Sequence, residues 1–202
     1  MKMYINSSWV DKSETMPVLN PFDQSIIDVV PKANASDVDA AIGSAVRGAK
    51  AMDKLTSHDR YLILRKTAAL LAERSEDLAR TITLEEGKVI AEGRTEVQRA
   101  IQTIIGSSEE AKRLHGETVP LDAAPGNVSQ FGFTIRVPVG VVAAIAPFNF
   151  PLNLVCHKVG PALAAGNSVV LKPAGDTPLS AIKLTEILLE AGLPTEAIQC
   201  IT

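Results

Sequence analysis

The stretch VGVVAAIA at residues 139–146 decides the fold, together with SVVLK at residues 168–172. Both runs are short, apolar and rich in valine, which is typical of strands that a parallel sheet buries on both faces. Between them we expect a helix from about Leu152, interrupted near Pro161 and closed at Gly166. The order strand, helix, strand predicts an α/β fold whose parallel sheet is covered by helices on both faces.

The same order continues once more. Thr177 is expected to cap a helix with Pro178 at its first position, because the first turn of a helix tolerates proline. That helix should end at Gly192, and residues 199–202 are expected to form a third strand. Residues 138–202 are therefore predicted to be a β-α-β-α-β unit.

Upstream of this unit, the spacing of apolar residues changes. Residues 1–34 are short apolar pieces broken by turns, with the clearest strand, SIIDVV, at 25–30. Helical spacing then predicts four helices: one capped by Ser36 and Asp37, one from Thr56 or Ser57, one from Ser75 to Glu86 before a cap at Gly87, and one from about 89 to 114. Residues 116–127 are interpreted as a loop, and 130–137 as a strand that could be half of a hairpin.

Composition excludes several classes of protein. Hydrophobic residues make up 46% of the 202 residues, which is too many for an intrinsically disordered chain. The formal net charge of −3 argues against a nucleic-acid partner held through neutralised phosphates. Cys156 and Cys200 form neither a disulfide framework nor a metal-ligand spacing, so we expect no metal. No secretion signal is visible at the N-terminus, so we expect a cytoplasmic protein.

One uncharged run, at residues 137–156, is long enough to span a bilayer. It contains three prolines and two asparagines, which break a single helix and are costly in lipid. A buried strand followed by a turn and a helix fits this run better, so we expect no membrane partner.

Two turns leave the carboxyl ends of the predicted strands, where open parallel sheets bind ligands. They are PFNFP at 147–151 and KPAGDTP at 172–178, and we expect them to open onto one crevice. Asn149 could donate its amide N–H to an oxygen that becomes negative in a transition state, or could hydrogen-bond its own turn. Lys172 could bind a ribose or phosphate, form a Schiff base, or remain solvated at the strand end.

Several common catalytic motifs are missing, among them G-x-G-x-x-G, G-x-x-x-x-G-K-[ST] and H-E-x-x-H. Cys156 and His157 are adjacent on a predicted helix and point about 100° apart, so they do not form a catalytic pair. Cys156 is expected to be a small buried hydrophobe. The acidic pairs Glu85-Glu86 and Glu109-Glu110 are interpreted as surface charges without an acid–base role.

The run PFNFPLNLVCHKVGPALAAGNSVVLKPAGDTPLSA at 147–181 resembles the NAD(P)-dependent aldehyde dehydrogenase superfamily. LEEGK at 84–88 and RVPVGVVAAIAPFNFP at 136–151 agree with this resemblance. It is similar to members of the lactaldehyde, non-phosphorylating glyceraldehyde-3-phosphate and phosphonoacetaldehyde type. The implied fold is the N-terminal part of the aldehyde dehydrogenase fold, with a partial doubly wound, Rossmann-like parallel sheet preceded by helices and small strands.

The resemblance also divides the chain. It implies that residues 1–116 are N-terminal strands and helices of the cofactor domain, that 117–137 are an oligomerisation hairpin arm, and that 138–202 begin the dinucleotide-binding sheet. Enzymes of this superfamily are more than twice as long as this chain. The resemblance therefore implies that this chain is the N-terminal part of a longer enzyme. It also implies that the complete enzyme is a homodimer or homotetramer.

Site residues follow from the resemblance position by position. Asn149 matches the asparagine whose amide helps to form the oxyanion hole for a thiohemiacetal, and Lys172 matches the lysine that hydrogen-bonds the adenosine ribose. Gly175 stands where NAD-preferring members carry glutamate, so NADP is expected to be accepted as well as NAD. The segment that lines the nicotinamide side of the cofactor is matched by Ile145, Ala146, Pro147 and Phe148.

The implied reaction is the oxidation of a small aldehyde to its carboxylic acid. In the family a cysteine thiolate attacks the aldehyde and a glutamate activates water, and both residues lie downstream of these motifs. Neither Cys156 nor Cys200 aligns with that nucleophile, so this chain alone is expected to be inactive. The alternative is a catalytically inert, truncated module that binds nucleotide or pairs with another subunit.

Arg99 gives the one hint about the substrate. It resembles the arginine that contacts the anionic end of the substrate in members acting on charged aldehydes, where it could grip an acid group with two hydrogen bonds. The alternative is an exposed helix arginine paired with Glu96 three residues earlier.

Overall fold

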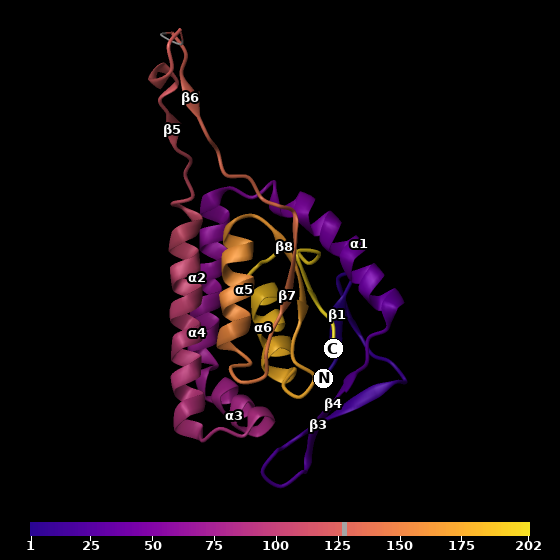
Figure 1. Ribbon diagram of the computed structural model, residues 1–202. Helices are drawn as coiled ribbons and strands as arrows, with labels where there is room; N and C mark the ends of the chain where they lie inside the picture. Colours follow the sequence, from indigo (N-terminus) through magenta and orange to yellow (C-terminus); the bar gives the residue numbers. More distant parts are fainter. Residues whose placement is uncertain (127–128) are drawn as a thin grey trace.

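A five-stranded sheet forms the centre of the computed structural model, which describes residues 1–126 and 129–202 (Figure 1). Its strand order is β2-β1-β9-β8-β7, and β7, β8 and β9 run parallel while β1 and β2 form an antiparallel hairpin beside β9. The bounds are β1 (Met3–Ile5), β2 (Ser8–Val10), β7 (Val141–Ile145), β8 (Ser168–Lys172) and β9 (Ile198–Cys200). The predicted α/β fold and its three parallel strands are confirmed.

Helices cover both faces of this sheet, as predicted. α1 (Ala35–Met52) lies on one face, while α5 (Asn153–Ala164) and α6 (Leu179–Glu190) lie on the other. α2 (Ser57–Glu73) and α4 (Ile90–Ala111) pack outside α5, and α3 (Ser75–Glu86) contacts α4 and α6. The buried apolar side chains accordingly form a small cluster under α1 and a larger one under α5 and α6.

The N-terminal helices begin close to their predicted positions, with one correction. Thr56 caps α2 as predicted, and its hydroxyl accepts from the main-chain N–H of Asp59 at 3.1 Å. α1 is capped by Asn34 rather than by Ser36 and Asp37. Asp37 is instead the third helical residue, and its carboxylate accepts from the Asn34 N–H at 2.7 Å, which completes a capping box.

Helix ends follow the sequence in part. α3 ends at Gly87, which has a left-handed φ of 89° as its predicted cap position requires. α4 ends at Ala111, three residues before the predicted 114. α5 is not interrupted at Pro161, because the helix continues to Ala164 and the Pro161 carbonyl still accepts from Ala165 at 3.0 Å. The carbonyl that loses its donor belongs to His157, an exposed residue that water can reach.

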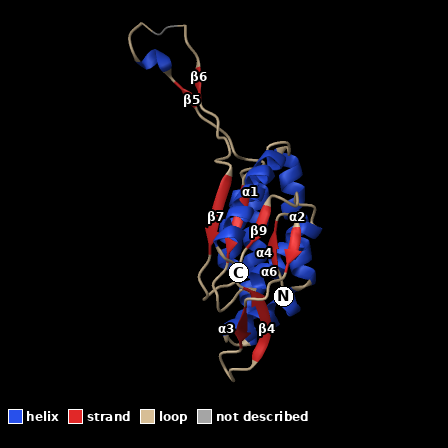
Figure 2. Cartoon of the chain, turned by 90° about the vertical axis from the view of Figure 1, so that its right-hand side faces the viewer, coloured by secondary structure: helices blue, strands red, loops and turns tan. Residues whose placement is uncertain are grey.

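The predicted hairpin arm projects from the body of the protein (Figures 1 and 2). Its paired strands are only β5 (Thr118–Val119) and β6 (Gly132–Phe133), so the strand predicted at 130–137 is much shorter. β5 and a 3-10 turn, Leu121–Ala123, lie inside the stretch predicted to be a loop. Residues 127 and 128 of the predicted loop and arm lie outside the described residues.

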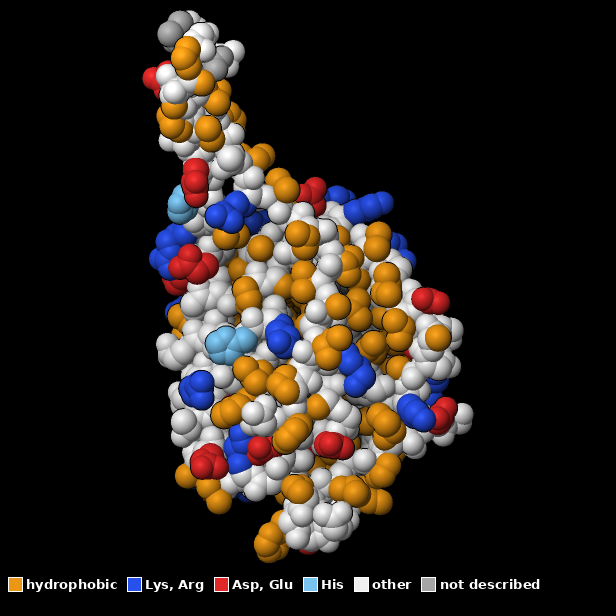
Figure 3. Space-filling view, in the orientation of Figure 1, with side chains coloured by type: hydrophobic (Ala, Val, Ile, Leu, Met, Phe, Trp, Pro, Cys, Tyr) orange, Lys and Arg blue, Asp and Glu red, His pale blue; other side chains and the backbone are white. Residues whose placement is uncertain are grey.

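Two further features complete the fold. A separate ribbon consists of β3 (Thr15–Leu19) and β4 (Ile26–Pro31), which confirms the strand predicted at 25–30. Apolar side chains are visible on the projecting arm and over the body of the protein in Figure 3. The exposed large apolar residues include Phe131, which is 78% exposed, and Ile145, which is 70% exposed. Within residues 1–126 and 129–202, no helix has the length and apolar character needed to cross a membrane.

Candidate functional site

The two predicted site turns leave the sheet side by side. Ile145 at the end of β7 is paired with Lys172 at the end of β8, so both strands finish at the same level. The N–H of Ala146 donates to the Lys172 carbonyl at 3.0 Å, which joins the starts of the two turns. The structure therefore brings together the residues that the sequence placed at the carboxyl edge of the sheet.

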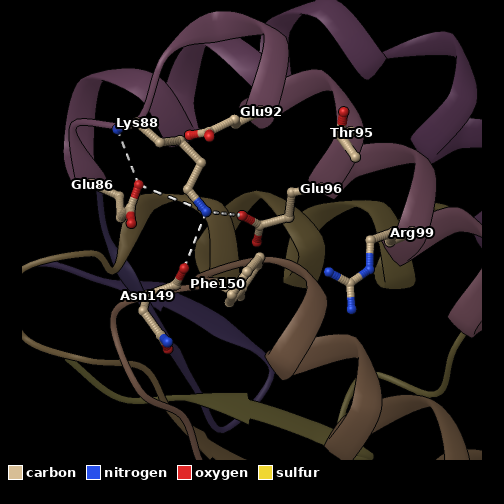
Figure 4. Close-up of a pocket in the computed structure, with 8 residues that line it drawn as sticks. All are labelled: Glu86, Lys88, Glu92, Thr95, Glu96, Arg99, Asn149 and Phe150. Atoms are coloured by element: carbon tan, nitrogen blue, oxygen red, sulfur yellow. Dashed lines mark hydrogen bonds and ion pairs between the residues drawn. The ribbon is translucent and has the colours of Figure 1, made fainter.

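A cavity of about 380 Å³ lies between α4 and the first turn (Figure 4). Its lining combines charged side chains from the α3–α4 connection and α4 with the turn itself. The lining residues are Glu86, Lys88, Glu92, Thr95, Glu96, Arg99, Asn149 and Phe150. Arg99 and Asn149, which the sequence assigned to substrate and to catalysis, line the same cavity.

The Lys88 side chain binds the main chain of the first turn. Its ammonium donates to the main-chain oxygen of Asn149 at 3.0 Å and to Glu96 Oε2 at 2.7 Å. It also lies 4.1 Å from the centre of the Phe150 ring, which is cation–π distance. Among the described residues, the Asn149 side-chain amide makes no hydrogen bond to its own turn, and the residue is exposed. The amide is thus available to a ligand.

Glu96 is buried beneath the turn. Its Oε1 atom accepts from the main-chain N–H of Leu152 at 2.9 Å and from that of Asn153 at 3.0 Å, at the start of α5. Of the predicted alternative for Arg99, the exposed position on the helix is confirmed, while the ion pair with Glu96 is wrong, since that carboxylate pairs with Lys88. The Arg99 guanidinium instead lies 5.4 Å from the Phe150 ring centre, on the other side of the ring from Lys88 in Figure 4.

The second turn is open to a ligand. Lys172 is half-buried, and its ammonium donates to the neighbouring carbonyl of Pro173 at 2.7 Å, which leaves further N–H groups for a hydroxyl or phosphate. Gly175 is exposed, and a Cβ atom added there would meet nothing within 4 Å. The second turn thus presents a lysine with unused N–H donors beside a glycine that has open space around it.

Glu85 is a functional candidate that the sequence missed. It was expected on the surface, but it is 2% exposed, and its carboxylate accepts from the main-chain N–H of Leu179 at 2.6 Å and of Ser180 at 2.9 Å. Burial raises its pKa to about 7. The helix cap predicted for Thr177 is also wrong: α6 begins after Pro178, and the Thr177 hydroxyl is buried without a hydrogen-bond partner among the described residues.

Neither cysteine is placed for catalysis. Cys156 and Cys200 are fully buried, and burial raises the pKa of the Cys156 thiol and raises that of Cys200 to about 12. Both thiols therefore stay protonated near neutral pH. The prediction that Cys156 is a buried hydrophobe is confirmed, and the neighbouring His157 is exposed. In the part of the chain that the structure describes, no cluster of His, Cys, Asp and Glu could hold a metal ion.

Comparison with known proteins identifies the family. The model of the aldehyde dehydrogenase family matches residues 9–202. The chain is 50% identical over 200 residues to 3-sulfolactaldehyde dehydrogenase of Priestia aryabhattai, covering 99% of this chain and 42% of that protein. It is 41% identical over 200 residues to the NADP(+) succinate-semialdehyde dehydrogenase of Escherichia coli, covering 98% and 41% respectively. The chain belongs to the aldehyde dehydrogenase family.

Solved structures agree with this assignment. Aldehyde dehydrogenase 21 from Physcomitrella patens, in complex with the reaction product succinate, matches with a TM-score of 0.95 and 40% identity, over 99% of this chain and 42% of that one. NADP-dependent glyceraldehyde-3-phosphate dehydrogenase from Bacillus halodurans, complexed with NADP, matches with a TM-score of 0.95 and 36% identity, over 100% and 43%. The chain thus spans less than half the length of these relatives, and its fold is the N-terminal part of theirs.

Proposed function

We propose that this chain forms the N-terminal, cofactor-binding part of an NAD(P)-dependent aldehyde dehydrogenase that oxidises a small anionic aldehyde to its acid. The observation that carries the proposal is the place of Arg99, in the cavity that Asn149 also lines. Because the chain covers 42% of the sulfolactaldehyde relative, the proposed activity is that of a whole enzyme of which this chain would form one part.

The charges in the cavity favour an anion at its Arg99 end. Glu96 and Glu86 lie 2.7 and 3.7 Å from the Lys88 ammonium, so that cation is already compensated. Glu92 lies seven residues from Arg99 on the same helix, which is about 10 Å along its axis. The Arg99 guanidinium has no ion pair among the described residues and can bind an acid group through two parallel N–H donors.

The names of the relatives support the same substrate class. 3-Sulfolactaldehyde and succinate semialdehyde are both small aldehydes that carry a second, acidic group. Asn149 would donate its amide to the aldehyde oxygen as negative charge develops there. Phe150 separates the Arg99 guanidinium from the Lys88 ammonium in the same cavity, so the acid group would meet Arg99.

Lys172, Gly175 and the segment Ile145, Ala146, Pro147 and Phe148 would hold the dinucleotide, whose nicotinamide accepts the hydride. Gly175 supplies no carboxylate that would repel a ribose phosphate, so NADP should bind in addition to NAD. Asp176 is the nearest acid in sequence, and it lines a different cavity with Glu85 and Thr177.

A catalytically inert pairing module is the second candidate. The exposed aromatic side chains of the arm, Phe131 at 78% and Phe133 at 65%, support burial against another subunit. In the enzyme proposal the same arm would serve a homodimer or homotetramer. The burial of Cys156 and Cys200 supports the proposal that the cysteine nucleophile of the whole enzyme is neither of them.

Steady-state kinetics of the full-length polypeptide test the proposal. Succinate semialdehyde and butyraldehyde have the same four-carbon chain and differ in the acid group. We expect kcat/KM with NADP+ to favour succinate semialdehyde by about a hundredfold, since a charge-assisted pair contributes up to about 3 kcal/mol. Equal kcat/KM values for the two aldehydes would overturn the proposal of an anionic substrate. If neither aldehyde is oxidised, the inert pairing module becomes the better proposal.

A further inference from the structure

The two helices that begin at the site turns share an unusual start. α5 begins within the sequence Pro151-Leu152-Asn153, and α6 begins within Pro178-Leu179-Ser180. Neither helix is capped by a side chain of its own cap residue. In both, one buried glutamate from outside the helix accepts from the two N–H groups that follow the proline.

The two contacts share their donors' place in the helix and differ in which carboxylate oxygens accept. Glu96 Oε1 takes the N–H groups of Leu152 and Asn153, and the two oxygens of Glu85 take those of Leu179 and Ser180. Proline has no N–H, so these are the first donors that each helix presents. A carboxylate satisfies both donors and meets the positive end of the helix dipole.

The glutamates are remote in sequence from the helices they cap. Glu85 precedes Leu179 by 94 residues, and Glu96 precedes Leu152 by 56 residues. They lie near one another, at the end of α3 and in the first half of α4. The α3–α4 hairpin therefore fixes the place where each site turn becomes a helix.

The two carboxylates differ in whether a neighbouring cation balances their negative charge. Glu96 has the ammonium of Lys88 at 2.7 Å, and Lys88 in turn holds the Asn149 carbonyl. Glu85 has no Lys or Arg partner in the described part of the chain, and the charged groups around it, Glu86, Asp176 and Glu96, are all acidic. A buried carboxylate without a cation is costly. The N–H groups of α6 are its main compensation, so Glu85 and the start of α6 hold each other in place.

We propose that Glu85 and Glu96 are positioning residues with separate tasks: Glu96 sets the turn that carries Asn149, and Glu85 sets the turn that carries Lys172 and Gly175. This inference rests on the proposed function for the roles of the two turns. The rigid prolines 151 and 178 transmit each position, because each lies directly between its turn and the capped N–H groups.

The variants Glu85→Gln and Glu96→Gln in the full-length polypeptide separate the two tasks. Glutamine keeps the size of the side chain but turns one oxygen into an NH₂ group, which repels donors. In Glu85→Gln this group faces one of the two N–H donors, because each Glu85 oxygen accepts one of them. In Glu96→Gln it faces either both N–H donors or the Lys88 ammonium, because one Glu96 oxygen accepts both N–H groups and the other accepts from Lys88. Glu76→Gln is the matched control, because Glu76 lies on α3 with a half-exposed carboxylate paired to Arg80 and Arg94. If Glu85→Gln does not fold, Glu85→Asp keeps the charge and withdraws it by one methylene.

The expected kinetic result is a split between parameters. Glu85→Gln should raise the KM for NADP+ about tenfold with a smaller change in kcat, while Glu96→Gln should lower kcat about tenfold with a smaller change in that KM. Equal changes of both parameters in both variants would show a general structural role and overturn the proposal. So would values indistinguishable from those of Glu76→Gln.

Hydrogen exchange provides a test that does not depend on activity. Glu85→Gln should speed exchange at the N–H groups of Leu179 and Ser180 about tenfold and leave those of Leu152 and Asn153 protected, and Glu96→Gln should do the reverse. Faster exchange at both helix starts in either variant would overturn the separate tasks. A polypeptide that oxidises no aldehyde but shows this exchange pattern would refute the proposed function and retain the helix positioning.

Discussion

The ammonium of Lys88 lies 3.0 Å from the main-chain oxygen of Asn149, although 61 residues separate them. The side chain of Lys88 is 9% exposed and that of Glu96 is fully buried, so the ion pair between them is shielded from water. Asn149 is thereby held by its main chain while its side-chain amide stays free. This contact ties the α3–α4 connection to the turn that carries the proposed oxyanion donor, Asn149.

Lys88→Met should destabilise the fold strongly, because it leaves the Glu96 carboxylate buried without its cation. We expect the free energy of unfolding to fall by about 3 kcal/mol, the cost typical of breaking one side of a buried pair. Urea unfolding of the full-length polypeptide measures this. The double variant Lys88→Met with Glu96→Gln should recover part of the loss, and additive losses would contradict the pairing.

Arg99→Leu should raise the KM for an anionic aldehyde about thirtyfold and leave a neutral aldehyde nearly unaffected, because only the first uses the guanidinium. Steady-state kinetics with succinate semialdehyde and butyraldehyde give the comparison. Arg94→Leu is the control on the same helix, since Arg94 pairs with Glu76 and lines another cavity. An equal effect of Arg99→Leu on both aldehydes would remove the anion role.

Gly175→Glu should lower the preference for NADP+ over NAD+ at least about tenfold, because a carboxylate there would repel a ribose phosphate. The substitution meets open space, since an added Cβ has no atom within 4 Å. Gly175→Gln adds the same bulk without charge and should change the ratio of the two KM values far less. If glutamine and glutamate act alike, size rather than charge decides the preference.

Glu85 should make stability depend on pH near neutrality. Burial raises its pKa from the ordinary 4.5 to about 7, helped by the charge of Glu96, and Glu86 and Asp176 face the same cavity. Between these values the folded protein holds a proton that the unfolded chain has released, so this stabilisation is full below pH 4.5 and is lost as the pH rises through 7.

Urea unfolding between about pH 5 and 8 measures this effect. Relative to Glu85→Gln, the unmodified protein should lose on the order of 3 kcal/mol across the window, at about 1.4 kcal/mol for each unit of pKa shift. Glu76→Gln serves as control, because Arg94 lowers the pKa of Glu76 and moves its titration below the window. Parallel curves for the protein and Glu85→Gln would show that Glu85 does not titrate there.

Local patterns were enough to predict the elements of the fold. The valine-rich runs at β7 and β8, the Thr56 cap and the Gly87 terminus each depend on neighbours within a few residues, and each was confirmed. The alternation of apolar and polar residues at 130–137 predicted too long a strand, because only Gly132–Phe133 pairs with another strand. Alternating residues show that a segment could have one apolar face as a strand. Whether it pairs depends on where the other half of the hairpin lies.

The neighbourhood of the two turns was predictable from the strands that precede them. Lys172 ends β8 and Asn149 lies four residues beyond the end of β7, and the parallel register brings their turns together. Glu85 and Glu96 could not be found this way, because the N–H groups that they accept lie 94 and 56 residues further along the chain. Nothing in the spacing of α3 or α4 distinguishes a glutamate that caps a distant helix from one in water.

Both remote caps precede in the chain the helix starts that they serve. A ribosome delivers Glu85 and Glu96 before Leu152 and Leu179, so the acceptors are already present when each helix start emerges. A circular permutant that begins between α4 and β7 would reverse this order of synthesis. The first N–H groups of its α5 and α6 would then lack their acceptors until the two glutamates were made. In normal synthesis, by contrast, both helix starts emerge after the side chains that accept their N–H groups.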